Sequence, residues 1–259
     1  MIRNLSTKGV ISGLLVAQIG IAGVLAGADL LRALPQIALP SSQPDFDRPT
    51  SPGDQTRRYT PSDMPLRPSR EGNPERPYQS TGDMPERLQF DISGDTLRLT
   101  GGIEAGDADR LADFLTGPNA PKDAATVTQA ALNSPGGSVY DALEIGRAIR
   151  AMGFNTRMEA EDICLSACPY ILAGGVARQV HPDAQVGMHQ HYFGANTVLP
   201  AFLAVEDIQH GQGEVMVYLE EMGVDLRVMQ HALLTPPDEI YVLLTEQLLD
   251  YALATEMLE

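Results

Sequence analysis

Strand-like runs and helical patterns alternate along residues 86–259, and this alternation limits the fold more than any other feature of the 259-residue chain. Strands separated by helices favour right-handed crossovers and a mostly parallel sheet. We therefore predict one α/β domain over 86–259. The predicted strands lie in 87–103 (a hairpin), 126–132, 154–159 and 177–191, the predicted helices in 105–117, 139–152, 164–175, 199–222 and 225–233, and a strand followed by a helix in 239–254.

One strand-to-helix connection in this pattern passes through Pro135-Gly136-Gly137, within "LNSPGGSV". Two glycines remove Cβ atoms, so a ligand can approach the backbone N–H groups closely. Those groups lie at the positive end of a helix dipole, which suits an anion or an oxygen that becomes negative during a reaction. A tight turn without any ligand fits the same residues.

The charge of the chain excludes one class of partner. The net charge is −16, and 34 acidic residues face 18 lysines and arginines. Because binding to a phosphate backbone depends on lysine and arginine, we expect no nucleic-acid partner. The hydrophobic content of 43% is sufficient for a sizeable core.

The first 34 residues predict export. The stretch Gly9–Ala28 carries no charge and follows Arg3 and Lys8, an arrangement that keeps the N-terminus cytoplasmic and sends the remainder across the membrane. About 20 apolar residues can span a bilayer, but Ala26-Gly27-Ala28 also has the small-x-small form of a cleavage site. A retained anchor and a signal cleaved near Ala28 both stay open, with a buried helix as the third alternative.

Residues 35–85 contain eleven of the nineteen prolines and show no apolar periodicity. This composition predicts a disordered or extended tether. A tether is more useful to an anchored protein than to a free one, which favours the retained anchor. The predicted regions are therefore an export segment over 1–34, a tether over 35–85 and the α/β domain over 86–259.

Ser166 and His189 are the candidate catalytic side chains. Ser166 follows a strand and opens an apolar helix, which places it at the carboxyl edge of the sheet, where open α/β folds bind ligands. His189 ends a short strand and can act as general base to a serine within hydrogen-bond reach. The alternatives are an N-cap serine and an edge-strand histidine without a role in chemistry.

Two carboxylates, Asp238 and Glu239, precede the last predicted strand. Either carboxylate could orient the histidine ring as the third member of a serine triad. The alternative is a solvated loop charge after Pro236 and Pro237.

Three motifs, "NSPGGSV", "SACPYILAGG" and "VGMHQ", follow one another in this chain. In this order and spacing they resemble the Clp protease proteolytic subunit and the wider Clp-protease/crotonase-like superfamily, in particular exported bacterial members. The resemblance covers about 86–259. It implies a single α/β domain built from ββα units.

The resemblance also implies roles for residues at matching positions. Ser166 corresponds to the nucleophile and His189 to the general base. Gly137 and Ala167 correspond to the residues whose backbone N–H groups form the oxyanion hole. The third member of the triad corresponds to Asp238 or Glu239, and Asp238 is favoured.

Cys164 and Cys168 bracket Ser166. In an oxidising compartment they could form a disulfide that fixes the serine-bearing turn. Zinc bound with His189 and His191 is an alternative, as are unpaired buried thiols. Helical residues four apart hold their Cβ atoms about 5–6 Å apart, and a disulfide needs roughly 3.5–4.5 Å. The bridge therefore requires Cys164 to lie outside a regular helix.

These observations predict an exported serine hydrolase, by resemblance a peptidase, that uses no cofactor. Its expected partners are peptides or unfolded polypeptides, the membrane through the N-terminal segment, and further copies of itself. Its expected place is the periplasmic side of the bacterial inner membrane, tethered or released. A catalytically inactive binding or assembly module of the same fold is the main alternative, and acyl-CoA chemistry of the crotonase type is a third.

Overall fold

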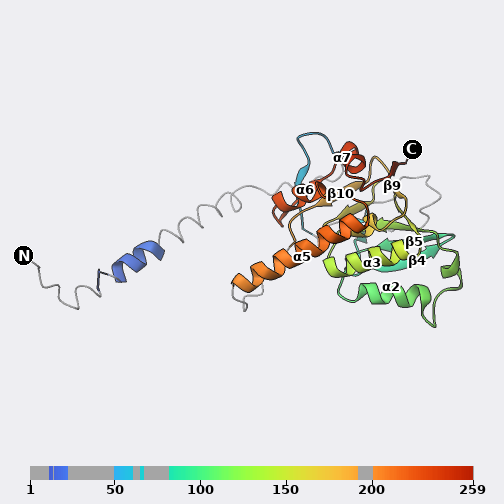
Figure 1. The fold of residues 1–259 in the computed structure, drawn as a ribbon, viewed down its shortest axis with the longest axis horizontal. Coiled ribbons are helices and arrows are strands. Elements are labelled where there is room, and N and C mark those ends of the chain that lie inside the picture. The colour runs from blue at the N-terminus through green and yellow to red at the C-terminus, as the bar shows by residue number, and fades with distance from the viewer. Residues whose placement is uncertain are drawn as a thin grey trace, which may run out of the picture. The chain divides into compact units, whose positions relative to one another are not determined.

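The computed structural model describes residues 12–13, 15–22, 50–60, 65–66, 82–191 and 201–258. The chain divides into two compact units, 1–43 and 44–259. In the first unit, residues 12–13 and 15–22 are helical (Figure 1). No helix within the described ranges is long and apolar enough to cross a membrane. The other residues of the predicted export segment, 1–34, lie outside the described ranges.

One sheet of the second unit has six strands in the order β12-β9-β7-β6-β5-β4. β4 and β5 form an antiparallel hairpin, and the other neighbouring pairs are parallel. Gly94 turns the hairpin with a φ of 64°, a left-handed value that glycine adopts without steric cost. The strands are β4 (Gln89–Ser93), β5 (Thr96–Thr100), β6 (Gln129–Asn133), β7 (Asn155–Met158), β9 (Arg178–Val180) and β12 (Glu256–Met257).

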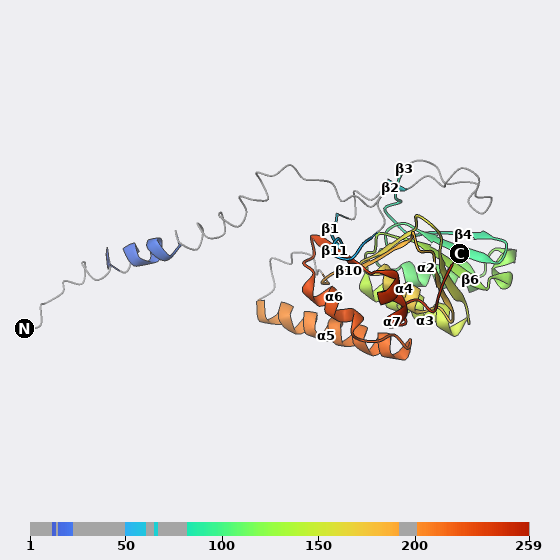
Figure 2. The ribbon, with the colours of Figure 1, turned by 90° about the horizontal axis from the view of Figure 1, so that it is seen from above.

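A second sheet has four strands in the order β1-β11-β10-β8. β8 and β10 are parallel, whereas β11 is antiparallel to both β10 and β1. Figure 2 shows β1, β11 and β10 side by side. The strands are β1 (Thr56–Arg58), β8 (Ile163–Leu165), β10 (Gln185–Met188) and β11 (Glu239–Val242), and a separate antiparallel pair consists of β2 (Pro65–Leu66) and β3 (Gly82–Asp83).

Local sequence explains why the helices form where they do, as α3 (Val139–Ala151) illustrates. The Ser138 hydroxyl caps its first turn by accepting a hydrogen bond from the Asp141 N–H at 3.3 Å. Ala142, Ile145 and Ile149 recur at helical spacing and are buried. The other helices are α2 (Asp107–Thr116), α4 (Cys168–Ala173), α5 (Ala201–Glu221), α6 (Val228–Leu234), α7 (Thr245–Asp250) and the short 3₁₀ helix η2 (Lys122–Thr126).

Helix α3 packs between α2 and α4, and Figure 1 shows α2 beside it. The backbones of Gly146 in α3 and Gly174 at the end of α4 are in close contact. A Cβ atom on Gly174 would overlap the Gly146 carbonyl oxygen, so this approach requires glycine. The Tyr218 hydroxyl of α5 donates to the Tyr170 carbonyl of α4 at 2.6 Å. These contacts hold α4, and the turn that precedes it, against the core.

The predicted α/β class is confirmed, and the six-stranded sheet is mostly parallel. The hairpin and the helix over 139–152 correspond to β4–β5 and α3. The predicted helix over 164–175 is shorter in the structure. Its first residues belong to β8, which pairs with β10, and the helix starts only at Cys168, just before Pro169.

The prediction of an unstructured tether over 35–85 is wrong for residues 50–60. β1 pairs with β11 in antiparallel register, and Arg57 is buried with its Nη1 3.1 Å from Gln185 Oε1 of β10. The ordered unit therefore includes a segment that lies outside the predicted domain of 86–259. β11 and Gln185 lie more than 120 residues further along the chain, so no local pattern reveals this pairing.

Candidate active site

Ser166 lies in a strained turn between β8 and α4. Its φ is 60°, a left-handed value that is uncommon for a residue with a side chain and that occurs often at functional sites. The Ser166 N–H donates to the Gly187 carbonyl of β10 at 2.9 Å, which fixes the turn against the sheet. A strand–turn–helix with a strained serine at its apex has the geometry of a nucleophile elbow.

His189 lies next to Ser166, with its Nε2 2.7 Å from the serine Oγ. The two residues meet because β8 and β10 are parallel neighbours and both side chains lie just beyond the carboxyl ends of these strands. The imidazole is only 7% exposed. In the tautomer that carries its proton on Nδ1, Nε2 accepts the serine proton, which is the contact a general base needs.

Burial, and to a smaller extent the nearby His191, lowers the pKa of His189 to about 4. The ring is therefore neutral near pH 7 and able to accept a proton. Its Nδ1 is buried and has no hydrogen-bond partner among the described residues. His191 forms a separate pair, with its Nε2 2.7 Å from the Tyr170 hydroxyl, and burial lowers its pKa as well.

The role assigned to Asp238 is wrong in this structure. The residue lines the same cavity as Ser166 and His189, but its side chain is exposed and makes no hydrogen bond to the unpartnered Nδ1. Its backbone carbonyl accepts the Tyr59 N–H at 3.0 Å, which directs the loop toward β1. Glu239 belongs to β11 and pairs in register with Arg58. Within the described residues, Ser166 and His189 therefore form a pair to which no carboxylate is bonded.

The backbone N–H groups of Gly137 and Ala167 donate to no acceptor among the described residues. Gly136 and Gly137 have φ values of 101° and 141°, a region that favours glycine. A Cβ atom on Gly136 would overlap Ser166 and the Ala167 nitrogen, so the glycine loop lies against the serine turn. Two free donors beside a serine are the components of an oxyanion hole.

The loop before α2 holds Gly137 in this position. The Ile103 N–H donates to the Gly136 carbonyl at 2.8 Å, and the Ser138 N–H donates to the Ile103 carbonyl at 2.7 Å. A Cβ atom on Gly137 would overlap the Ile103 carbonyl oxygen. The loop and the glycine pair therefore fit together only when glycine occupies position 137.

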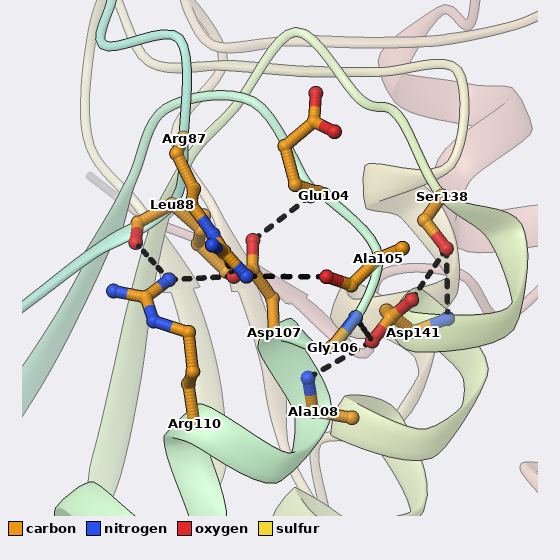
Figure 3. A network of polar contacts seen from close by, with 10 residues as sticks. All are labelled: Arg87, Leu88, Glu104, Ala105, Gly106, Asp107, Ala108, Arg110, Ser138 and Asp141. Carbon is orange, nitrogen blue, oxygen red and sulfur yellow. Dashed lines mark hydrogen bonds and ion pairs between the residues drawn. The ribbon is translucent and has the colours of Figure 1, made fainter.

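Two buried aspartates fix that loop in turn (Figure 3). Asp141 accepts the N–H groups of Gly106 at 3.0 Å and Ala108 at 3.1 Å, and also the Ser138 hydroxyl at 2.6 Å. Asp107 accepts the Glu104 N–H at 2.8 Å and forms ion pairs with the two arginines drawn in the figure, Arg87 and Arg110. Burial opposes ionisation of Asp107, but these hydrogen bonds and the arginines lower its pKa overall.

Cys164 and Cys168 are joined by a disulfide that spans the serine turn, with their Cα atoms 5.0 Å apart. Cys164 belongs to β8 and Cys168 begins α4, so the bridge meets the condition that Cys164 lies outside a helix. The zinc alternative is wrong because neither sulfur is a free thiolate. Across the described part of the chain, no cluster of three or more histidine, cysteine or acidic side chains could hold a metal ion.

A cavity of about 510 Å³ brings the candidate residues together. Ser166, His189 and Gly137 line it, as does Asp238 at its exposed edge. The remaining lining includes His191, Tyr59, Thr60, Val139 and Pro237. Most of the exposed surface of the cavity wall is apolar, and a small set of polar groups lies within it. This combination is typical of a ligand-binding site.

Tyr59 is the functional candidate that the sequence patterns missed. It lies in the stretch predicted as tether, yet it is 6% exposed, and its ring centroid is 4.9 Å from that of His189. The local signal is weak: Thr56, Tyr59 and Thr60 are residue types that are common in strands, and they lie between two prolines. Comparison of the chain with protein-family models and with curated proteins gives no match.

Proposed function

We propose that this protein is a serine hydrolase that cleaves peptides with a Ser166–His189 dyad. One observation carries the proposal: a buried, neutral histidine lies 2.7 Å from a strained serine in a cavity lined by Gly137. These are the parts that nucleophilic catalysis by serine requires. The order of the three motifs supports a Clp-protease-like domain within the α/β class.

The reaction follows from these positions. Ser166 Oγ bonds to the substrate carbonyl carbon while its proton moves to His189 Nε2. The carbonyl π electrons move onto oxygen, which the N–H groups of Gly137 and Ala167 receive. When the tetrahedral intermediate collapses, the C–N bond breaks and the leaving amine takes the proton from His189. Water then attacks the acyl-enzyme by the same route and restores Ser166.

The proposed location is the far side of a membrane, with short or unfolded peptides as substrates. The uncharged N-terminal stretch after Arg3 and Lys8 supports export. The Cys164–Cys168 disulfide supports an oxidising compartment, because such bonds are rare in the cytosol. Tethering through residues 1–34 and assembly with further copies belong to the same proposal.

A second candidate, a binding module without turnover, rests on a specific observation. His189 Nδ1 has no hydrogen-bond partner in the described structure, and a histidine without an orienting carboxylate is a weaker base in catalysis. Such a module would bind peptides in the same cavity without cleaving them.

Labelling with a fluorophosphonate separates the two candidates. The full-length protein is treated with the probe, and the adduct is mapped by mass spectrometry. The hydrolase predicts labelling at Ser166 that Ser166→Ala abolishes. Ser93→Ala, which changes an exposed serine in the β4–β5 hairpin, serves as the matched control and keeps the label. Intact protein that binds peptides but takes no label at Ser166 would establish the binding module instead.

A further inference from the structure

We propose that Tyr59 is a positioning residue of this hydrolase, which holds the nucleophile, the base and the oxyanion loop in register in place of a triad carboxylate. The inference rests on the proposed function and extends it to a residue outside the three motifs. It also makes the segment 50–60 a part of the active site.

The first step is that Tyr59 is fixed in place. Its N–H donates to the Asp238 carbonyl at 3.0 Å, at the end of the pairing between β1 and β11. At the other end of β1, Gln55 Nε2 lies 2.5 Å from the Tyr241 hydroxyl and 3.2 Å from Gln247 Oε1. The strand that carries Tyr59 is therefore attached at both ends to the sheet that carries His189.

The second step concerns the Tyr59 hydroxyl. It donates a hydrogen bond to the Pro135 carbonyl, and it lines the same cavity as Ser166, whose side chain is near enough to influence the pKa of Tyr59. The Tyr59 proton is bonded to this carbonyl, and the single Ser166 proton points to His189 Nε2, so the phenol oxygen limits where Ser166 can lie without accepting its proton. The hydroxyl thus anchors the residue that precedes Gly136 and Gly137, in the cavity that also holds the nucleophile. Burial raises the pKa of Tyr59, so its hydroxyl stays neutral and protonated.

The third step concerns the Tyr59 ring. It packs against the imidazole with a 4.9 Å centroid separation and an interplanar angle of 51°. No hydrogen bond orients the imidazole through Nδ1, so packing on this face limits its rotation. The ring covers part of His189, and burial as a whole is the main reason that the histidine stays neutral.

The other titratable groups around His189 do not replace this contact. His191, from the same strand end, is bonded to Tyr170 of α4. Asp238, from the loop before β11, is exposed at the cavity edge. Tyr59, which directly follows β1, therefore packs on the base and shares the cavity with the nucleophile.

The test compares Tyr59→Phe and Tyr59→Leu in the full-length protein with a fluorogenic peptide. Tyr59→Phe keeps the ring and removes the hydroxyl, so kcat should fall about tenfold while KM changes little. The acid limb of its pH–rate profile should stay where it is. Tyr59→Leu removes the ring as well, so water reaches His189, its pKa rises toward the ordinary value, and the acid limb moves to higher pH.

Tyr140→Phe and Tyr140→Leu are the matched controls, because Tyr140 is 72% exposed. Both should leave kcat and the pH profile unchanged. A Tyr59→Phe enzyme with the wild-type kcat would overturn the role of the hydroxyl. A folded Tyr59→Leu enzyme with an unmoved acid limb would overturn the role of the ring, and Tyr59→Met supplies this readout if the leucine variant unfolds.

The two proposals fail in different ways. Wild-type protein that takes no fluorophosphonate label at Ser166 contradicts the hydrolase itself. Wild-type protein that is labelled, with Tyr59→Phe equally active, contradicts only the role of Tyr59.

Discussion

At the scale of single residues, the arrangement of the dyad comes from one hydrogen bond, between Ser166 and His189, and no carboxylate among the described residues orients the histidine. Ser166 and His189 meet because β8 and β10 run in parallel, and the low pKa of His189 follows from burial. A neutral histidine needs no carboxylate to keep its lone pair available at neutral pH. It gains no help, however, in stabilising the imidazolium that forms during the reaction.

The pH dependence of activity follows from the same burial. Protonated His189 cannot accept the Ser166 proton, so kcat/KM should fall as the pH drops through the pKa of His189 in the free enzyme. With that pKa at about 4, the activity should persist at pH 5 to 6, where an ordinary histidine is largely protonated. A pH–rate profile between pH 3 and 8 measures this limb, and half-maximal activity at pH 6.5 or above would contradict it.

Gly137 supports a second prediction at this scale. A Cβ atom at this position would overlap the Ile103 carbonyl oxygen, and the φ of 141° disfavours side chains. Gly137→Ala must displace the loop and its N–H group, so kcat should fall about 100-fold, the typical cost of losing an oxyanion donor.

The matched control for Gly137→Ala is Gly153→Ala, which also has a positive φ, 72°, but faces open space. It should reduce stability by about 1 kcal/mol and leave kcat unchanged. Equal kcat values for the two variants would remove Gly137 from the site.

At the scale of elements, the disulfide joins the end of β8 to the start of α4 across Ser166. It closes a loop of only a few residues, so the loss of chain entropy accounts for about 2 kcal/mol of stability. It also has a local effect, because it fixes the turn that carries Ser166 and the Ala167 N–H.

Reduction, or Cys164→Ser combined with Cys168→Ser, should therefore lower kcat of the folded enzyme by about tenfold, since small displacements of a nucleophile are costly. The unfolding midpoint should fall only modestly. Thermal denaturation and peptide hydrolysis on the same samples check this. A double variant with full activity and a much lower midpoint would show that the bridge serves stability alone.

The network in Figure 3 supports a prediction about the loop before α2. Asp141→Ala leaves the Gly106 and Ala108 N–H groups and the Ser138 hydroxyl without their acceptor, so the free energy of unfolding should fall by about 2–3 kcal/mol. Because Ile103 and Ser138 hold the glycine loop, kcat should fall as well. The exposed Asp113→Ala on α2 is the control. Chemical denaturation that gives equal stabilities for both variants would contradict this role.

The sequence predicted the elements whose signals are local. α3 has its cap, its apolar spacing and its terminal glycine within about fifteen residues, and the hairpin has Gly94 between alternating strands. The contact between Ser166 and His189 was also predicted, because both residues lie in the motifs that resemble the Clp protease family. Asp238 could not be excluded from the triad in advance, because its place depends on the contact of its carbonyl with Tyr59, 179 residues earlier in the chain.

At the scale of the whole molecule, β1 illustrates the same limit. Its sequence lies among prolines and polar residues, and it is ordered by non-local contacts: pairing with β11, the Arg57–Gln185 hydrogen bond and the Tyr59 contacts at the cavity. The prolines around it block longer strands but allow a three-residue edge strand. The predicted domain boundary at residue 85, which is based on composition, therefore excludes Tyr59, although this residue is in contact with His189.

This arrangement predicts how truncation divides the molecule. A protein that begins at Pro44 retains the whole second unit, so it should match the full-length protein in unfolding midpoint and kcat. A protein that begins at Pro61 lacks β1 and Tyr59. It should unfold at a lower temperature, because an edge of β11 loses its backbone partners and buried side chains are exposed, and it should lose most of its activity. Adding a peptide of residues 50–60 in trans should restore part of the activity if β1 acts by completing the site. Equal activity of the two truncated proteins would instead place the catalytic unit wholly within 61–259 and remove β1 from the mechanism.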